Sequence, residues 1–215
     1  MSPESARETA AGAIVRVCRR LYDRGLIAGP DGNVSVRLDG GAILVTPAGL
    51  SKVDVTEPDL VVVDLSGQVV EGRHRPSSEL RMHLRIYETR PDVRAVVHAH
   101  PPMATAFAVV GHDLMAPILP EVILQMNEVP LVPYATPGSA ALADLIARYA
   151  RNHDAFLLAN HGATTVGATI THAHQRMESL EHAARIVWAA RVMGPVRPLT
   201  DENVRDLLSS HEGTE

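Results

Sequence analysis

Cysteine and aromatic residues are scarce in this chain of 215 residues, and positive charge is not in excess. Cys18 is the only cysteine, which excludes a disulfide within the chain. Aromatic residues make up 3% of the chain, so its core must be built mainly from Ala, Val, Leu and Ile. The net charge of −5 at pH 7 argues against a surface that binds nucleic acid or anionic lipid, because both need a basic patch.

Long apolar runs are also absent. No run approaches the roughly 18 apolar residues that a membrane-spanning helix needs. Residues 1–8 are polar and acidic, unlike a secretion signal. We therefore expect a cytoplasmic protein with neither membrane nor nucleic-acid partners. The apolar content of 46% and the length predict a single domain over residues 1–215 with a substantial core.

Apolar periodicity and turn residues predict a mixture of helices and strands. Helices are expected at residues 4–25, 77–89, 101–109, 136–150, 170–193 and 201–209. Strands are expected at residues 33–38, 42–45, 60–65, 93–99, 155–159 and 163–166. The segment 117–134 is interrupted by prolines and is expected to be irregular strand and loop. Hairpin-spaced strands with helices around one core indicate the α+β class.

Two histidines lie two residues apart in a strand-like run, Val96-Val97-His98-Ala99-His100. Side chains alternate along a strand, so both imidazoles face the same side, with Cα atoms roughly 6.6 Å apart. His161 follows another strand-like run. Three imidazoles with one open position are typical of a catalytic zinc site. The alternative is that these are half-buried histidines without a ligand.

Such a site also needs an acid or base, and Glu79 is the candidate. Ser77 or Ser78 is expected to cap the helix over residues 77–89. The helix dipole favours a carboxylate in the first turn, so helix capping is the alternative role for Glu79. Sequence spacing by itself does not place Glu79 near the histidines.

A second group of histidines lies in the helix predicted over residues 170–193. His174, Glu178 and His182 share one helix face and could bind a metal, although side chains at this spacing more often form a solvated or interface stripe. The other histidines have no clear partner and are predicted to lie at the surface: His74, His83, His112, His153 and His211.

Three segments carry small residues that could bind phosphate. They are Gly32-Asn33-Val34-Ser35, Thr46-Pro47-Ala48-Gly49 and Ser77-Ser78. The third begins a predicted helix, where free N–H groups and the helix dipole favour an anion. Each segment could equally be a simple turn.

Taken in order, these motifs resemble the class II aldolase/adducin family, and in particular zinc-dependent L-fuculose-1-phosphate aldolases. The resemblance extends from the first helix to about residue 210. It rests on Gly32-Asn33-Val34-Ser35-Val36-Arg37, Thr46-Pro47-Ala48-Gly49, Pro76-Ser77-Ser78-Glu79, Val97-His98-Ala99-His100, Pro133-Tyr134-Ala135-Thr136 and Asn160-His161-Gly162.

The resemblance implies roles for individual residues. One zinc ion per subunit would be bound by His98, His100 and His161. Glu79 would be a further ligand at rest and the catalytic acid/base once substrate displaces it. Phosphate would be bound by Asn33, Gly49, Ser77 and Ser78.

The resemblance also implies an architecture and a reaction. The fold would have three layers, a central and mainly antiparallel sheet flanked by helices on both sides, assembled as a homotetramer with active sites between subunits. The substrate would be a small sugar phosphate of the fuculose 1-phosphate or 5-deoxypentulose 1-phosphate type. It would be cleaved to dihydroxyacetone phosphate and an aldehyde through an enediolate, whose negative charge zinc stabilises as a Lewis acid.

Two positions depart from the pattern of the fuculose-phosphate aldolases. Ala48 stands where these enzymes often have a threonine in the phosphate loop, so one hydroxyl contact is missing. The neighbourhood of residue 119 lacks the tyrosine that donates a proton to the departing aldehyde oxygen. Glu121 is the candidate to replace this tyrosine, and a surface carboxylate is its alternative role.

Other reactions of the family remain open. The same zinc site could dehydrate methylthioribulose 1-phosphate, epimerise a pentulose phosphate at C4 or decarboxylate a sugar-acid phosphate. A non-catalytic adducin-like domain would lack the metal-binding histidines, and all three are present here.

Overall fold

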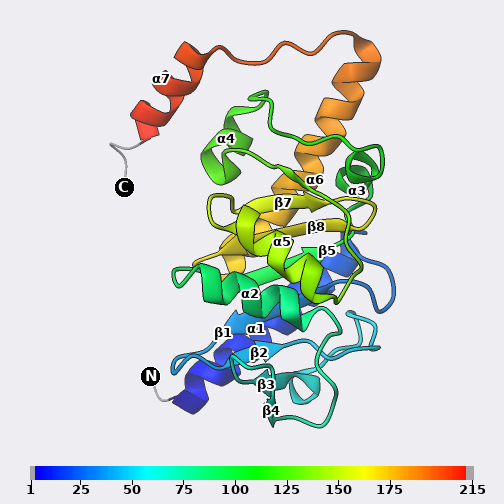
Figure 1. The fold of residues 1–215 in the computed structure, drawn as a ribbon, viewed down its shortest axis with the longest axis vertical. Coiled ribbons are helices and arrows are strands. Elements are labelled where there is room, and N and C mark those ends of the chain that lie inside the picture. Colours follow the sequence, from blue (N-terminus) through cyan, green and yellow to red (C-terminus); the bar gives the residue numbers. More distant parts are fainter. Residues whose placement is uncertain (1–2, 212–215) are drawn as a thin grey trace.

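One eight-stranded sheet forms the centre of the protein (Figure 1). The computed structural model describes residues 3–211. The strands lie in the order β4-β3-β2-β1-β5-β8-β7-β6, and all pairs are antiparallel except β6 with β7. The strands are β1 (Asn33–Arg37), β2 (Ile43–Val45), β3 (Val61–Val63), β4 (Val69–Glu71), β5 (Ala95–Ala99), β6 (Leu131–Val132), β7 (Ala155–Leu158) and β8 (Gly162–Gly167).

Helices cover both faces of this sheet. In the described residues they are α1 (Pro3–Asp23), α2 (Leu80–Thr89), α3 (Pro102–Val109), α4 (Pro120–Met126), α5 (Ala140–Ala150), α6 (Ile170–Met193) and α7 (Asp201–His211), with a 3-10 turn at Glu57–Asp59. Helices α2 and α5 pack together on one face, and α1, α3 and α6 lie on the other (Figure 1). The α+β fold with a mainly antiparallel central sheet between two helical layers is thereby confirmed.

Alternation along β5 decides which layer the histidines face. Ala95, Val97 and Ala99 belong to the core beneath α1, α3 and α6. Val96 belongs to the second core, beneath α2 and α5. Because side chains alternate along a strand, His98 lies on the same face as Val96, in the layer of α2.

The segment 117–134 is more regular than expected. It contains α4 and the two-residue strand β6. Pro120 occupies the first turn of α4, where its ring suits the helix and its missing N–H costs no hydrogen bond. The expectation of irregular strand and loop was therefore wrong for α4, because a helix of seven residues is too short to show clear apolar periodicity, and it was right for β6 and the loops around it.

Helix α2 begins later than expected, at Leu80, with Glu79 in the capping position. Neither serine is the N-cap residue. Ser77 lies in the preceding turn, which is held to the loop after β2 by a hydrogen bond from its backbone N–H to the carbonyl of Thr46. This attachment delays the helix and places Glu79 at the junction between turn and helix.

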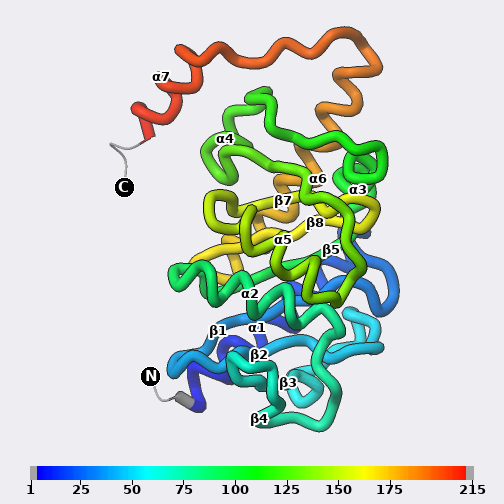
Figure 2. Tube along the Cα trace, viewed as in Figure 1, coloured from blue at the N-terminus to red at the C-terminus, as the bar shows by residue number. Residues whose placement is uncertain are grey.

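The C-terminal part of the chain leaves the sheet. Figure 2 shows the segment after α6 running outward to α7, which lies at the opposite end of the molecule from β4. Helix α7 has no buried residues and contacts α4. None of the described helices is long and apolar enough to cross a membrane.

Candidate metal centre and substrate cavity

The candidate site forms where several elements end on the sheet face covered by α2. Asn33 begins β1 and lies opposite His98 of β5 in the strand register. His161 lies in the turn between β7 and β8, and Glu79 directly precedes α2. Residues that are far apart in the sequence therefore meet at one end of the central strands β1, β5 and β8.

The turn that carries His161 has a steric reason for its sequence. Asn160 has φ of 56°, in the left-handed region that Asn tolerates better than most residues. A Cβ atom on Gly162 would lie 2.5 Å from the carbonyl oxygen of Ala99 and 2.6 Å from Cδ2 of His100. Glycine is therefore required for β8 to pass this close to the end of β5.

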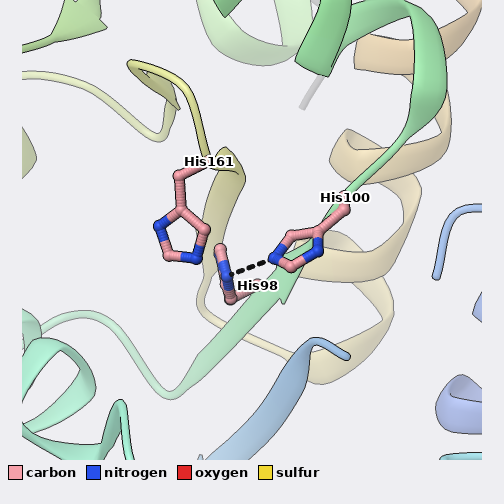
Figure 3. Close-up of side chains that lie close together, drawn as sticks. All are labelled: His98, His100 and His161. Carbon is pink, nitrogen blue, oxygen red and sulfur yellow. Dashed lines mark hydrogen bonds between the residues drawn. The ribbon is translucent and has the colours of Figure 1, made fainter. Parts of the chain in front are cut away.

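The three predicted metal ligands converge (Figure 3). One ring nitrogen from each of His98, His100 and His161 lies within 4.8 Å of the others. The ring centroids are 4.7 to 5.1 Å apart. Nε2 of His100 is 3.2 Å from Nε2 of His98, the pair joined by the dashed line in Figure 3.

Glu79 lies against two of these rings, although its sequence position did not require this. Its Oε2 is 3.2 Å from Nε2 of His98, and its Oε1 is 3.3 Å from Nε2 of His161. The Asn33 amide donates a hydrogen bond of 2.9 Å to Oε2. The carboxylate is buried, so these contacts determine its ionisation.

The charge states at the centre follow from burial and from these neighbours. Burial would raise the pKa of Glu79, but His98 and His161 outweigh it and hold this pKa well below its usual range. Burial also lowers the pKa of His161 from 6.5 to about 4. Burial and the neighbouring His98 lower the pKa of His100. A carboxylate and neutral imidazoles at neutral pH are the forms that ligate metals.

The donor set fits a divalent transition metal. Nδ1 of His98 is 2.9 Å from the carbonyl oxygen of Ala163, so Nδ1 donates to that carbonyl and Nε2 faces the centre. Among the described residues, Oε1 of Glu79 is buried without a hydrogen-bond partner. An unpaired buried carboxylate oxygen beside three imidazoles is what a cation would satisfy.

A cavity of about 240 Å³ opens beside the centre. It is lined by Glu79, His100 and His161 at one end and by all four predicted phosphate ligands, Asn33, Gly49, Ser77 and Ser78. A larger hollow of about 560 Å³ lies along α4 and α6, but it contains none of these residues. The smaller cavity is therefore the candidate substrate site.

Two charged residues of this cavity were not anticipated from the sequence. Oδ2 of Asp31 is 3.6 Å from Nδ1 of His100. Lys52 also lines the cavity, with a buried side chain whose Nζ donates to the carbonyls of Pro30 and Leu50 at 2.8 and 3.0 Å. Burial lowers the pKa of Lys52. The sequence around a single lysine in a loop does not indicate that its side chain will be buried beside a cavity.

The prediction that His83 lies at the surface is wrong. Its side chain is completely buried and contacts Asn33 and Ser35. His83 lies four residues after Glu79, so it occupies the same side of the chain one helical turn on. That spacing was the one signal in the sequence that could have identified it.

The alternative group on α6 does not form a comparable centre. Nδ1 of His174 is 3.6 Å from Oε2 of Glu178, while His182 is exposed. The carboxylate of Glu181 instead accepts hydrogen bonds from the backbone N–H groups of Met103 and Ala104 and caps α3. In residues 3–211, the three histidines described above are the one group placed to hold a metal.

Glu121 is not brought to this centre within the chain. It lies in the first turn of α4, is exposed and does not line the cavity. A role in catalysis would therefore require Glu121 to come from another copy of the chain.

Comparisons with known proteins agree with the fold and with the motifs. Residues 12–188 match the family model for the class II aldolase and adducin N-terminal domain. The chain is 38% identical over 172 residues to an L-fuculose phosphate aldolase of Methanococcus maripaludis, covering 80% of this chain and 92% of that protein. It is 34% identical over 209 residues to a 3-oxo-tetronate 4-phosphate decarboxylase of Pectobacterium atrosepticum, covering 94% of each.

A solved structure gives the same result. An L-fuculose 1-phosphate aldolase superposes with a TM-score of 0.88 at 31% identity, covering 95% of this chain and 96% of that one. The family match spans most of the chain, and both relatives span nearly their own full length. The chain therefore belongs to the class II aldolase/adducin family, and the matched residues 12–188 include the sheet, the histidine centre and the cavity lining.

Proposed function

We propose that this protein is a zinc-dependent lyase that cleaves a small ketose 1-phosphate, of the fuculose or 5-deoxypentulose type, to dihydroxyacetone phosphate and an aldehyde. One observation carries the proposal. Glu79 and two of the three imidazoles, His100 and His161, border a cavity whose wall also contains all four predicted phosphate ligands, and His98 completes the histidine group. A cation site and an anion site in one cavity suit a sugar phosphate.

His98, His100 and His161 would hold the metal, with Glu79 as a further ligand when no substrate is bound. Nitrogen ligands with one open position favour zinc. A bound ion would supply Lewis-acid stabilisation of negative charge on the substrate oxygens.

Glu79 would transfer the proton to and from the carbon that stays with dihydroxyacetone phosphate. Cleavage moves one proton from the hydroxyl of the carbon that becomes the aldehyde to the carbon that stays with dihydroxyacetone phosphate. In the reverse, addition direction, Glu79 removes that carbon-bound proton again. The His98 and His161 contacts keep Glu79 ionised, which is the form that a base requires.

The phosphate would lie among Asn33, Gly49, Ser77 and Ser78, bound by side-chain hydroxyl, amide and backbone N–H groups. Ala48 lines the same cavity without a hydroxyl. The Lys52 ammonium near this wall would add the positive charge that a phosphate dianion favours.

We further propose a homotetramer in which a neighbouring subunit supplies Glu121. In cleavage Glu121 would take the proton from the hydroxyl oxygen that becomes the aldehyde oxygen, and in the addition direction it would return that proton. Within one chain Glu121 is exposed on α4 and outside the cavity. Two inactive variants, Glu79→Gln and Glu121→Gln, test this directly. After mixed refolding they should regain activity that neither shows alone, because some sites then combine two intact residues. Full activity of Glu121→Gln by itself would place Glu121 outside the reaction, and absence of complementation between the two variants would contradict its supply by a neighbouring subunit.

Decarboxylation of a 3-oxo sugar-acid phosphate is the second candidate reaction. The specific observation in its favour is the match to the 3-oxo-tetronate 4-phosphate decarboxylase over 94% of both chains. Decarboxylation also leaves negative charge next to a carbonyl, so the same centre could stabilise it.

Product analysis separates the two reactions. The zinc-loaded protein should be incubated with a panel of ketose 1-phosphates and 3-oxo sugar-acid phosphates, then again after chelation. Release of dihydroxyacetone phosphate from a ketose 1-phosphate, lost on chelation, is the expected result. Release of carbon dioxide from an acid substrate, without aldol cleavage, would replace the aldolase proposal by the decarboxylase.

A further inference from the structure

His83 is the most deeply placed histidine next to the candidate site, yet no proposed step uses it. Its side chain is fully buried in the layer between α2 and the sheet. Burial lowers its pKa from 6.5 to about 3, so the ring is neutral at physiological pH. A neutral imidazole has one donor nitrogen and one acceptor nitrogen, and its neighbours decide which is which.

Four hydrogen bonds link His83 to Glu79 on one side and to Tyr87 on the other. Nε2 of His83 is 2.5 Å from Oδ1 of Asn33, and the Asn33 amide nitrogen is 2.9 Å from Oε2 of Glu79. On the other side, Nδ1 of His83 is 2.7 Å from the Ser35 hydroxyl, which is 2.8 Å from the Tyr87 hydroxyl. All these groups are buried.

The directions of these bonds follow from the charge of Glu79. An ionised carboxylate only accepts hydrogen bonds, so Asn33 must turn its NH₂ group toward Glu79. The amide oxygen of Asn33 then faces His83, whose Nε2 must be the donor. Nδ1 is left as an acceptor for the Ser35 hydroxyl, and Ser35 accepts in turn from Tyr87.

A reversed amide would be costly. With Asn33 turned over, its oxygen would lie about 2.9 Å from an ionised oxygen of Glu79, and its NH₂ group would face the donor nitrogen of His83. Asn33 also lines the cavity where phosphate is expected. The orientation of one amide therefore affects both the carboxylate and the anion site.

We propose that His83 is a positioning residue that fixes the Asn33 amide with its NH₂ group toward Glu79 and the cavity. Ser35 and Tyr87 support this role by satisfying the other ring nitrogen of His83. The inference deepens the proposed function and rests on it only for the identity of the substrate.

The alternative is that His83 merely fills space beneath α2. The network argues against this, because a polar chain in a well-packed apolar layer costs desolvation that a hydrophobic residue would avoid. Ile86, on the same buried face of α2, shows that the layer accepts aliphatic side chains.

A double-mutant cycle tests the proposal with two readouts that need no turnover. The first is the affinity for inorganic phosphate, measured by calorimetry on the full chain. The second is the NMR signal of the Asn33 side-chain amide, assigned from its loss in Asn33→Leu. His83→Phe keeps a ring of similar shape but removes both nitrogens.

We expect His83→Phe to weaken phosphate binding roughly 10- to 100-fold, the size of a lost hydrogen bond to a charged group, and to speed exchange of the Asn33 amide protons. In the Asn33→Leu background, the same substitution should have no further effect on phosphate, because His83 acts through Asn33. Ile86→Val, a buried change on the same helix, is the matched control and should leave both readouts unchanged.

Three results would overturn the inference: an unchanged Asn33 amide signal in His83→Phe, equal loss of phosphate affinity in both backgrounds, or an equal effect of Ile86→Val. The proposed function fails separately. If the zinc-loaded protein cleaves no sugar phosphate while the Asn33 amide still responds to His83, then the positioning role stands and the proposed reaction does not.

Discussion

Two regions of this molecule are rich in histidine and acidic residues, and only one of them forms a centre. His98, His100 and His161 come from one strand and a distant turn, and their ring nitrogens lie within 4.8 Å of one another. On α6, Nδ1 of His174 and Oε2 of Glu178 are in contact at 3.6 Å, but His182 is exposed and these residues form no metal-binding group among those described.

The difference shows that spacing on one helix is not sufficient for a metal site. Side chains at intervals of four share a helix face, yet they project outward and side by side rather than toward one point. Side chains from separate elements can surround a point, and the sheet holds those elements rigidly. The contrast predicts different outcomes for matched substitutions in the two regions.

Removing one histidine from each region should have opposite results. His100→Ala should abolish zinc binding and activity while the protein stays folded, because the half-buried ring lies at the end of β5 and outside both cores. His182→Ala should retain zinc and activity. Metal content and circular dichroism of the two variants measure this. Normal turnover in His100→Ala would show that the metal lies elsewhere.

The carboxylates of the two regions should differ in the same way. Glu79→Gln should slow the reaction by roughly 10²–10⁴-fold, the usual contribution of a general acid or base. Glu178→Gln removes a partner of Arg24 and His174 on α6 and should leave the rate unchanged. Equal rates in wild type and Glu79→Gln would remove Glu79 from the proposed chemistry.

Removal of zinc by a chelator should lower the thermal stability of variants with an intact histidine centre and leave that of His100→Ala unchanged. Zinc that binds only the folded state, at a free concentration of about 100 times its dissociation constant, adds about 2.7 kcal/mol to the free energy of unfolding. In a chain of this size that raises Tm by roughly 5–10 °C. We expect this shift in wild type and in His182→Ala, measured by calorimetry with zinc and with a chelator. His100→Ala should show no shift, and a shift as large as that of wild type would contradict the assignment.

The smallest expected effect concerns His83 in the metal-free protein. Its pKa is lowered by burial from 6.5 to about 3, so below pH 6.5 the unfolded chain binds a proton that the folded chain does not. The stabilisation is thus present above pH 6.5 and lost as the pH falls. By about pH 5 the free energy of unfolding should fall by about 2 kcal/mol on this account.

Urea denaturation at several pH values measures this loss. His83→Phe should show a shallower decline between pH 6.5 and pH 5 than wild type, whatever its stability at neutral pH. Parallel curves would show that His83 is not buried in its neutral form.

Much of the fold and of the site could be predicted because the relevant signals are local. The two-residue period of a strand predicts that His98 and His100 share a face, and motif order predicts the family. The family and the α+β fold are confirmed. Helix α4 escaped prediction because seven residues show too little periodicity, and β4 because three exposed residues show no alternation with burial.

Other features could not be predicted because burial depends on the whole fold. The one signal for the burial of His83 was its four-residue spacing from Glu79, and that signal is informative only once Glu79 is known to be buried. Lysine side chains are almost always exposed. The burial of Lys52 beside the cavity depends on hydrogen bonds from its Nζ to two loop carbonyls.

The sequence by itself determined which residue types and motifs are available: three histidines, a glutamate after two serines and glycine-rich turns in a fixed order. Strand alternation and turn chemistry are local, so the chain carries them without reference to distant parts. Only the tertiary structure decided that Glu79 lies between His98 and His161, that Asn33 joins Glu79 to His83, and that Glu121 stays outside the cavity. Those contacts join residues 19 to 82 positions apart or depend on which face of a helix is buried, and sheet pairing and packing alone set them.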